Sequence, residues 1–571
     1  MPFRNIETHF SQAPQAKIKR SSFRYNKPIK TTFNAGELVP FLCEEVLPGD
    51  TFDLKLSKVI RLNPSLHPTM DNLYVDTYYF FVPNRFLWDN WTHFMGESDK
   101  AWTDNITYIP PHIVFNGSLG LPYWDPQDNA PQSLLNYLGI PSFGTLYGTS
   151  LKKKFDLSML PINAYIKVWN DWFRSENLVD VCPMYTSDGI LPRAYAIAYG
   201  SFIDNNFGTS GAGLVNSISL LPVAKYADYF TRALPQPQKG SDVLIPAGGD
   251  VILKNDWTDF ATSSGTPIFI SNVGGTPTYP GTSQSLTSGG GSGIQLGGTG
   301  YTAYDPKGTL GFEGLEITVN NLRLAMQTQR LLERDARGGT RYIELIKSHF
   351  NVVSPDLRLQ RSEYLGGKRS LINMTEVIQT SEATATSPLG QLAGRSLTTG
   401  IEDSFIKSFT EHGFIIGVLC VRPDRTYSQG IEKMWSRFER LDYYFPVLAN
   451  IGEMPIKNQE IYLTDSTESV DMDDVFGYQE AWAEYRTQRG RNTGYMQPGI
   501  TGSLVSWTYA DEYSSTPMLS AEWLYQGKAE LDRTLAISSS TAPQFIADLL
   551  VYGKTVRPLP VYSIPGLVDH N

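Results

Sequence analysis

Histidine, cysteine and clustered acids are the residue types from which this chain would have to build a catalytic or metal site. The seven histidines, at positions 9, 67, 93, 112, 349, 412 and 570, lack the spacing of metal ligands. The three cysteines, Cys43, Cys182 and Cys420, are far apart and form no Cys-x-x-Cys pair, so neither a disulfide framework nor a zinc site is indicated. We therefore expect no metal, no cofactor and production in a reducing compartment.

The sequence motifs of common enzyme classes do not occur either. There is no GxxxxGK(S/T) phosphate loop and no HExxH pair. A nucleophile elbow needs GxSxG, and the nearest stretch, around Ser292, lacks the last glycine. Asp471, Asp473 and Asp474 resemble the start of a calcium loop, but Phe476 stands where that loop needs glycine, which favours a solvated acidic turn. The sequence predicts that the protein is not an enzyme.

The first 30 residues are strongly basic. They contain seven lysines and arginines against one acid, Glu7, and little hydrophobic periodicity, which predicts an extended basic arm. Such an arm could be a solvated surface segment, or it could neutralise phosphates and stack aromatic side chains on bases. The net charge of −10 excludes a protein that coats nucleic acid with its whole surface, but not one with a single basic face. The candidate DNA-contact residues are Lys17, Lys19, Arg20, Phe23, Arg24, Lys27 and Lys30.

A second basic stretch, Arg337 to Gly367, separates two strand-rich halves of the chain. Apolar residues recur at helical spacing over 318–336 and again over 341–350, and the pair of glycines at 338 and 339 marks a stop between two helices. The basic residues that follow show no catalytic pattern. We interpret the stretch as a rigid, positively charged connector.

Composition favours β structure for most of the 571 residues. Glycine (49) and proline (36) are frequent, aromatic residues make up 12% and charged residues only 19%, a balance typical of aromatic strands joined by turns. Alternation predicts a half-buried strand over 52–62. Residues 73–82 and 413–421 are apolar on both faces, which predicts strands buried on both sides, and 544–556 returns to a strand pattern.

Long segments between these strands carry other patterns. Short amphipathic helices are predicted over 86–94 and 163–175, and 424–540 is a second long excursion. From Phe260 to Tyr304 there is no charged side chain and glycine occurs 11 times, which predicts an inserted surface loop. Prolines near the C-terminus predict an extended tail. With no signal peptide and no apolar run of about 18 residues, we expect a soluble, unexported chain without membrane insertion.

Several long blocks closely resemble the major capsid protein of gokushoviruses, which are single-stranded DNA bacteriophages of the Microviridae. The connector RGGTRYIELIKSHFNVVSPDLRLQRSEYLGG is one of them, and KTTFNAGELVPFLCEEVLPGDTF is another. The remaining blocks follow in the family's order at 70–91, 228–240, 428–455, 475–486 and 557–570. The resemblance does not extend to 97–150 or 256–310, and it is loose over 500–545.

The resemblance implies a mainly β fold, an eight-stranded antiparallel jelly roll with very long insertions that contain short helices. It implies a basic arm over 1–30 and one jelly-roll domain over 31–571, with insertions at 97–240, 256–310 and 424–540 and an extended tail at 557–571. On this reading sixty copies close a small icosahedral shell around a circular single-stranded DNA genome in the host bacterial cytoplasm. Other virion or scaffolding proteins are further candidate partners.

The same resemblance suggests roles for two sets of residues. In this family the variable insertion forms a protrusion at the three-fold axes, and 256–310 is its counterpart, facing outward toward a host surface receptor. The candidate residues there are Tyr279, Tyr301 and Tyr304. The connector arginines would contact another subunit or the genome, and these are Arg337, Arg341, Arg358, Arg361 and Arg369.

Composition alone also leaves open a protein of a different class. A jelly-roll carbohydrate-binding or glycan-cleaving protein would use exposed tryptophan and tyrosine as sugar platforms, and its paired carboxylates would meet only in the fold. Particle size separates the two alternatives, because a lectin or hydrolase is a monomer or small oligomer.

Overall fold

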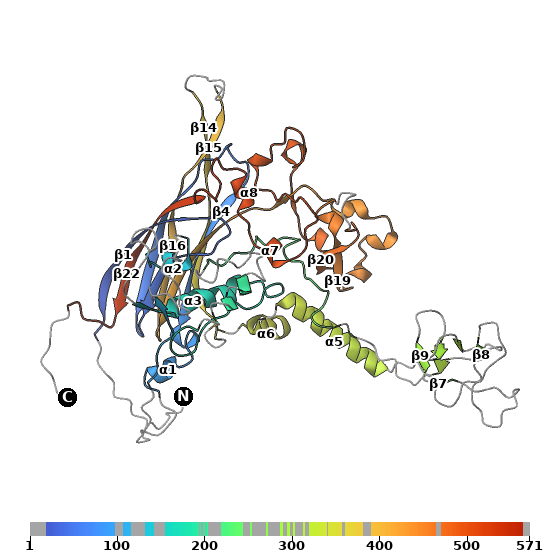
Figure 1. Cartoon of the computed structure of the whole chain (residues 1–571), viewed down its shortest axis with the longest axis horizontal. Coiled ribbons are helices and arrows are strands. Elements are labelled where there is room, and N and C mark those ends of the chain that lie inside the picture. The colour runs from blue at the N-terminus through green and yellow to red at the C-terminus, as the bar shows by residue number, and fades with distance from the viewer. Residues whose placement is uncertain are drawn as a thin grey trace, which may run out of the picture. The chain divides into compact units, whose positions relative to one another are not determined.

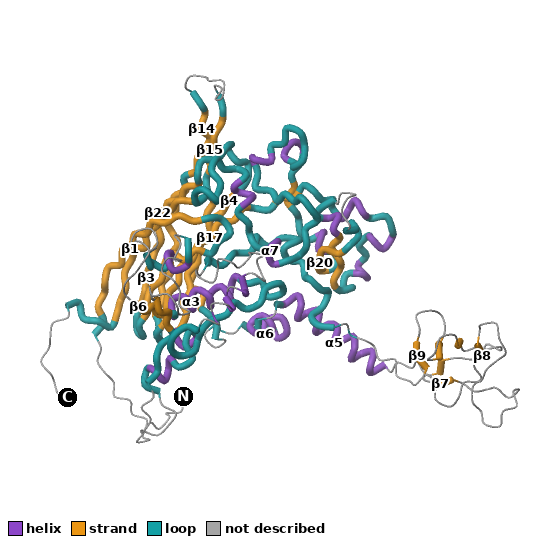
Figure 2. Tube along the Cα trace, in the orientation of Figure 1, coloured by secondary structure: helices purple, strands orange, loops and turns teal. Residues whose placement is uncertain are grey.

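Two antiparallel sheets of four strands each form the centre of the protein in a computed structural model (Figures 1 and 2). The first sheet has the order β1 (Ser21–Phe33), β22 (Phe545–Arg557), β3 (Thr51–Leu62), β16 (Thr398–Ser408). The second has the order β13 (Glu363–Leu371), β4 (Leu73–Pro83), β17 (Gly413–Pro423), β2 (Val39–Val46). The chain passes from sheet to sheet between most successive strands, and its first strand pairs with its last, as in a jelly roll. The predicted fold class is confirmed.

The structure describes most of the chain, with gaps. The described residues are 19–97, 107–115, 132–141, 155–192, 195, 198–199, 201–203, 219–241, 243, 252–253, 270–271, 286–288, 294–296, 301–302, 312–313, 319–339, 341–353, 355–356, 360–380, 390–463 and 470–562.

The space between the two sheets is filled by the inward positions of alternating strands. In β3, the side chains of Phe52, Leu54 and Leu56 are buried, while the residues between them are partly or fully exposed. Phe33 at the end of β1 stacks on Phe545 at the start of β22 with 5.2 Å between ring centroids. Each such side chain stabilises the fold by about 1.5–3 kcal/mol relative to exposure. The predicted strand over 52–62 is therefore confirmed, and its period-2 pattern follows from one buried face.

The two central strands of the second sheet, β4 and β17, are buried on both faces, as predicted. One face contributes to the core between the sheets, and the other packs against helix α3 (Leu160–Val168) and the segments around it (Figure 1). Tyr165 on α3 donates a hydrogen bond to the carbonyl oxygen of Leu38 at 2.7 Å and accepts one from the amide of Leu221 at 2.9 Å. Burial raises the pKa of the Tyr165 hydroxyl, so it stays neutral in this core.

The predicted basic arm is wrong for residues 21–30, because these residues form the first part of β1. β1 pairs with β22 along its whole length, from Ser21 opposite Arg557 to Phe33 opposite Phe545. Strand β1 is at the edge of its sheet, where a proline such as Pro28 is tolerated because only one side of the strand needs donors. Its pattern was missed because lysine and tyrosine take inward positions that an apolar residue usually occupies.

Two long excursions leave the sheets, one after β4 and one after β17. The first runs from 84 to 362 and contains the predicted insertions 97–240 and 256–310. The second runs from 424 to 544 and contains the whole of the predicted 424–540. The chain divides into two compact units, 1–237 with 335–571 and 238–334. The second unit contains the whole of 256–310.

Helices are few and mostly short. The two predicted helices around the connector are confirmed as α5 (Val319–Gly338) and α6 (Tyr342–Phe350). The helix predicted over 163–175 is α3 continued by a π-helix, and the one predicted over 86–94 is divided into two short turns. The other helical segments are η1 (Asn84–Phe86), α1 (Trp91–Phe94), α2 (Leu134–Tyr137), η3 (Trp169–Phe173), η5 (Lys433–Ser436), η6 (Arg440–Asp442), η7 (Pro446–Leu448), η8 (Asn458–Glu460), η9 (Ala483–Tyr485), η10 (Gly494–Met496), η11 (Val505–Trp507), α7 (Ala521–Leu524) and α8 (Ala529–Asp532).

Among the described residues, no helix is long and apolar enough to span a membrane.

Short strands outside the two sheets form smaller sheets of two to four strands. The short strands are β5 (His112–Phe115), β6 (Phe155–Ser158), β7 (Ile252–Leu253), β8 (Ile270–Ser271), β9 (Leu286–Ser288), β10 (Ile294–Leu296), β11 (Tyr301–Thr302), β12 (Phe312–Glu313), β14 (Met374–Ile378), β15 (Leu392–Ser396), β18 (Thr426–Tyr427), β19 (Glu453–Lys457), β20 (Val475–Glu480) and β21 (Gly490–Arg491).

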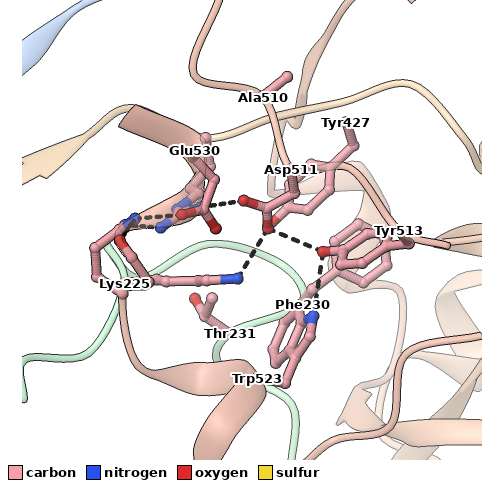
Figure 3. Close-up of polar contacts among 12 residues, drawn as sticks. Lys225, Phe230, Thr231, Tyr427, Ala510, Asp511, Tyr513, Trp523 and Glu530 are labelled. Carbon is pink, nitrogen blue, oxygen red and sulfur yellow. Dashed lines mark hydrogen bonds and ion pairs between the residues drawn. The ribbon is translucent and has the colours of Figure 1, made fainter. Parts of the chain in front are cut away.

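A buried ionic cluster joins the second excursion to Lys225 in the first (Figure 3). The Asp511 carboxylate forms an ion pair with Lys225 at 3.0 Å and another with Arg425. It also accepts a hydrogen bond from the Tyr513 hydroxyl at 2.9 Å. The indole of Trp523 donates to that same hydroxyl at 3.1 Å. All three charged side chains are at most 5% exposed, so the charges depend on one another rather than on water.

The ionisation of Asp511 links this cluster to pH. Burial by itself raises the pKa of Asp511, but Arg425 and Lys225 outweigh burial and hold that pKa below its usual range. A carboxyl group whose pKa is lower in the folded chain than in the unfolded chain stabilises the folded state above the unfolded pKa. Its contribution is therefore complete above pH about 4 and is lost as the pH falls through the lower folded pKa.

We expect Asp511→Asn to lower the free energy of unfolding by about 3–5 kcal/mol at neutral pH, because two buried cations lose their carboxylate. Urea unfolding of the unassembled subunit measures this loss. The difference between variant and wild type should shrink below pH about 4, where the wild-type carboxylate is also being protonated.

Asp53→Asn is the matched control, since Asp53 is a partly exposed partner of Lys554 at 3.9 Å. A surface ion pair of this kind contributes about 0–1 kcal/mol. Equal losses in the two variants, or a pH-independent loss in Asp511→Asn, would contradict the role assigned to the buried cluster.

Candidate contact surfaces

The outward face of the first sheet is basic. Because side chains alternate along a strand, every second residue of β1, β3 and β22 points away from the core. The exposed cations at these outward positions are Arg24, Lys30, Lys55, Arg61 and Lys554, which we call the basic face. The outward acids of the same three strands are Asp53 and Asp548, so five cations and two carboxylates leave an excess of three positive charges.

The strand register sets the spacing of these charges. Lys30 lies opposite Asp548, and Arg24 lies opposite Lys554, which in turn lies opposite Asp53. Neighbouring strands are about 4.8 Å apart, so the cations are spread over the sheet rather than gathered at one point. Such a spread of positive charge suits a polyanion that follows the surface better than a single small anion.

Only some of the predicted DNA-contact residues lie on this face. Arg24 and Lys30 belong to it, and Lys19 is exposed just before β1 with Arg20. Lys17 lies outside the described residues. Phe23 is at one of the inward-facing positions of β1, on the side opposite to the basic face.

Lys27 also points to the opposite side of β1. Its ammonium group pairs with Glu44 on β2 at 2.6 Å, and the Tyr25 hydroxyl donates to the same carboxylate at 2.7 Å. Burial, followed by Glu44, raises the pKa of Tyr25. These contacts join the edge strands of the two sheets, so Lys27 serves the fold.

Sequence reasoning missed three members of the basic face, Lys55, Arg61 and Lys554. Lys55 and Arg61 are the polar positions of the alternating pattern over 52–62, so the pattern contained the signal. What it lacked was the pairing of β1, β22 and β3, which brings residues hundreds of positions apart onto one surface.

The connector arginines make contacts within the chain. Arg337 pairs with Glu453 and donates to Gln479 at 2.6 Å. Arg369 pairs with the buried Asp76 at 2.8 Å. These two side chains attach the connector to the rest of the unit, and Arg358 lies outside the described residues.

Arg341 and Arg361 line one cavity of about 410 Å³ beside the π-helix. Arg341 pairs with Glu176 at 2.5 Å, and Arg361 stacks on the ring of Trp172 at 3.6 Å. Burial, followed by the charge of Arg341, lowers the pKa of Arg361. Arg174 and Lys167 also line this cavity and Asp171 is its one lining acid, so the charged residues of its wall are mainly cations.

Of the three candidate tyrosines in 256–310, only Tyr301 belongs to the part of the chain that the structure describes. The backbone of Tyr301 belongs to β11, which pairs with β8 and β10. Tyr279 and Tyr304 lie outside the described residues.

Cys182 and Cys420 are buried, and Cys43 is half-buried. Burial is the main cause that raises the pKa of Cys43 to about 12 and that of Cys420 to about 11, and it also raises the pKa of Cys182. A thiol with a raised pKa forms little thiolate and reacts slowly.

The acidic turn is held by its own backbone. Asp471 accepts from the amide of Asp473 at 3.2 Å, Asp474 accepts from the amide of Asp471 at 3.1 Å, and Asp473 pairs with Lys457 at 2.6 Å. No group of three histidine, cysteine or acidic side chains suited to a metal occurs in the described parts of the chain.

Comparison with known proteins identifies the family. The family model described as capsid protein (F protein) matches residues 11–567. The chain is 35% identical to capsid protein VP1 of Chlamydia phage 1, with 98% of both chains covered. It is 35% identical to capsid protein VP1 of Bdellovibrio phage phiMH2K and 34% identical to that of Spiroplasma virus 4, each time over 99% of this chain and 98% of the relative.

These relatives are capsid proteins of gokushoviruses, and they support a structural role with no enzymatic activity. They give no support to the carbohydrate-binding alternative. The chain therefore belongs to the capsid protein (F protein) family, and it is a structural component of a virion that assembles with copies of itself into a shell.

Proposed function

We propose that sixty copies of this chain close a small icosahedral shell around a circular single-stranded DNA genome. The observation that carries this proposal is the near full-length match to gokushovirus capsid proteins, joined to a jelly roll whose strands leave long excursions free for contacts. Loops of this kind can make the different contacts that two-, three- and five-fold axes need. Sedimentation of the purified protein tests it, because a sixty-copy shell sediments far faster than a monomer or small oligomer.

Assembly takes place in the host bacterial cytoplasm, where thiols stay reduced. The three free cysteines are consistent with this location. Other virion or scaffolding proteins act as additional partners during assembly.

The basic face contacts the genome. Its excess of three positive charges and its spread over three strands suit the phosphates of a DNA strand, read without regard to sequence. The arm before β1, with Lys17, Lys19 and Arg20, adds to this contact. The cationic cavity of Arg341 and Arg361 is a further place where a phosphate or a neighbouring subunit's acid would bind.

We expect the triple variant Arg24→Gln, Lys30→Gln, Lys554→Gln to carry less DNA per particle. Each lost phosphate contact should also reduce the salt slope of single-strand binding by the dissociated subunit by about 0.7, or roughly 2 for the three. Absorbance ratios of purified particles and a salt titration of DNA binding measure the two effects.

Lys27→Gln is the matched control for Lys30→Gln, because it removes the same charge from the opposite side of the same strand. It should leave the salt slope unchanged. Unchanged DNA content in the triple variant, or equal slopes lost by Lys27→Gln and Lys30→Gln, would reject the basic face as a genome contact.

The insertion 256–310 faces outward and contacts a host receptor through side chains that include Tyr279, Tyr301 and Tyr304. Two observations support this proposal: residues 260–304 are hydrophilic without charge, and the insertion belongs to a compact unit of its own, 238–334. A separate unit can vary without changing the core of the jelly roll.

Deletion of residues 262–300 should therefore leave shells intact and reduce their adsorption to host cells. Sedimentation scores assembly, and depletion of particles from a suspension of host cells scores adsorption. Loss of assembly without a soluble subunit would show that the segment is structural, and normal adsorption of deleted shells would reject the receptor contact.

A further inference from the structure

An exposed apolar segment runs from Met434 to Ile451 in the second excursion, which is drawn in orange in Figure 1. It consists of the three short turns η5, η6 and η7 and the residues between them. Its large exposed apolar side chains are Met434, Trp435, Phe438, Leu441, Tyr443, Tyr444, Phe445, Val447 and Ile451. Phe438 is 87% exposed and Val447 is 93% exposed, so the most apolar side chains meet solvent in the isolated chain.

Three contacts with Glu484 and Trp482 hold this segment on the rest of the excursion. Arg437 is only 8% exposed and pairs with Glu484 at 2.7 Å. The indole of Trp482 donates to the carbonyl oxygen of Leu448 at 2.9 Å, and Tyr444 packs on the Trp482 ring with 5.6 Å between centroids. The arrangement differs from an ordinary surface loop, because Arg437 is inside while nine large apolar side chains are exposed.

This anchoring also fixes the shape of the segment. A guanidinium ion pair, an indole hydrogen bond and aromatic contacts hold the turns at several points, so the apolar side chains are presented on a set backbone. A surface that is already ordered loses less entropy when it binds.

The size of the exposed surface is that of a protein interface. Nine partly exposed side chains, several of them aromatic residues of 150–250 Å² each, give roughly 1,000 Å² of apolar surface. The largest apolar patch of a typical soluble monomer is about 300–600 Å². A standard interface buries about 800 Å² on each partner.

We propose that the segment Met434–Ile451 is a subunit interface, buried against a second copy of this chain in the shell. This inference rests on the proposed shell, and it assigns the contact to a particular segment. Trp435 and Phe438 are the expected anchors, since exposed aromatic side chains on a fixed backbone dominate the energy of such interfaces.

A copy of the same chain fits this surface better than a membrane. The three turns are each three or four residues long, whereas a membrane-surface helix needs a continuous amphipathic face. Charges at the segment also have both signs, with Arg440 beside Glu439 and Asp442, and give no basic excess for anionic lipid. An obligate interface between subunits, in contrast, is rich in aromatic residues and methionine.

Cysteine labelling tests the assignment directly, because Cys182 and Cys420 are buried and the raised pKa of all three native thiols makes them react slowly. A maleimide should label Val447→Cys in the dissociated subunit, and labelling should be lost in the assembled shell. Met518→Cys, at a side chain that is 78% exposed outside the segment, should be labelled in both states. Equal labelling of Val447→Cys in subunit and shell would overturn the proposal.

A second variant separates assembly from folding. Phe438→Glu places a charge on the apolar surface and leaves the contacts with Glu484 and Trp482 in place. The subunit should therefore keep its wild-type urea midpoint and fail to sediment as a shell. Met518→Glu, the matched control, should still assemble. Shells formed normally by Phe438→Glu would reject the interface, whereas a wild-type chain that forms no shell would instead reject the proposed function.

Discussion

β4 and β17 are buried on both faces, and the rest of the fold depends on this constraint. A sandwich of two sheets covers only one face of each, so the outer face of β4 and β17 needs a second cover. The first excursion supplies it through α3 and the segments around it. The part of the first excursion around α3 is thus part of the core of the jelly roll. Among the described residues, the outward cations of β1, β3 and β22 in the first sheet remain exposed, and this face carries charge.

Charged groups in this protein are placed according to what faces them. Lys225 and Arg425 are buried and both pair with the buried Asp511. The buried Asp76 likewise pairs with two arginines, Arg422 and the half-exposed Arg369. Burial without a partner would cost several kcal/mol per charge, so these groups fix which segments meet. The basic face has the opposite character, because its cations outnumber its acids and remain in solvent.

The sequence predicted elements best where one physical pattern governed the whole element. β3 alternates because one face is buried, and β4 and β17 are continuous apolar runs because both faces are buried. β1 was not predicted as a strand because its inward positions hold Lys27 and Tyr25. Both side chains contact the carboxylate of Glu44 on another strand. That partner cannot be read from local sequence.

The contact surfaces were harder to predict for the same reason. The arginine-rich connector was visible as a charge run, but its arginines are largely occupied by acids and carbonyls of distant segments, such as Glu453 and Asp76. The basic face exists only after three strands pair. The segment around Phe438 was assigned from sequence only to the excursion 424–540, and only the fold shows that its apolar side chains are exposed.

The pairing of the first strand with the last has a consequence for synthesis of the chain. β22 lies between β1 and β3, so the first sheet lacks an inner strand until residues 545–557 have left the ribosome. Until then the edges of β1 and β3 are unpaired, and such edges are prone to pairing with other chains. A prematurely terminated chain therefore cannot complete its core. The pairing of β22 with β1 and β3, which joins residues far apart in sequence, thus acts as a checkpoint that only full-length subunits pass before they join a shell.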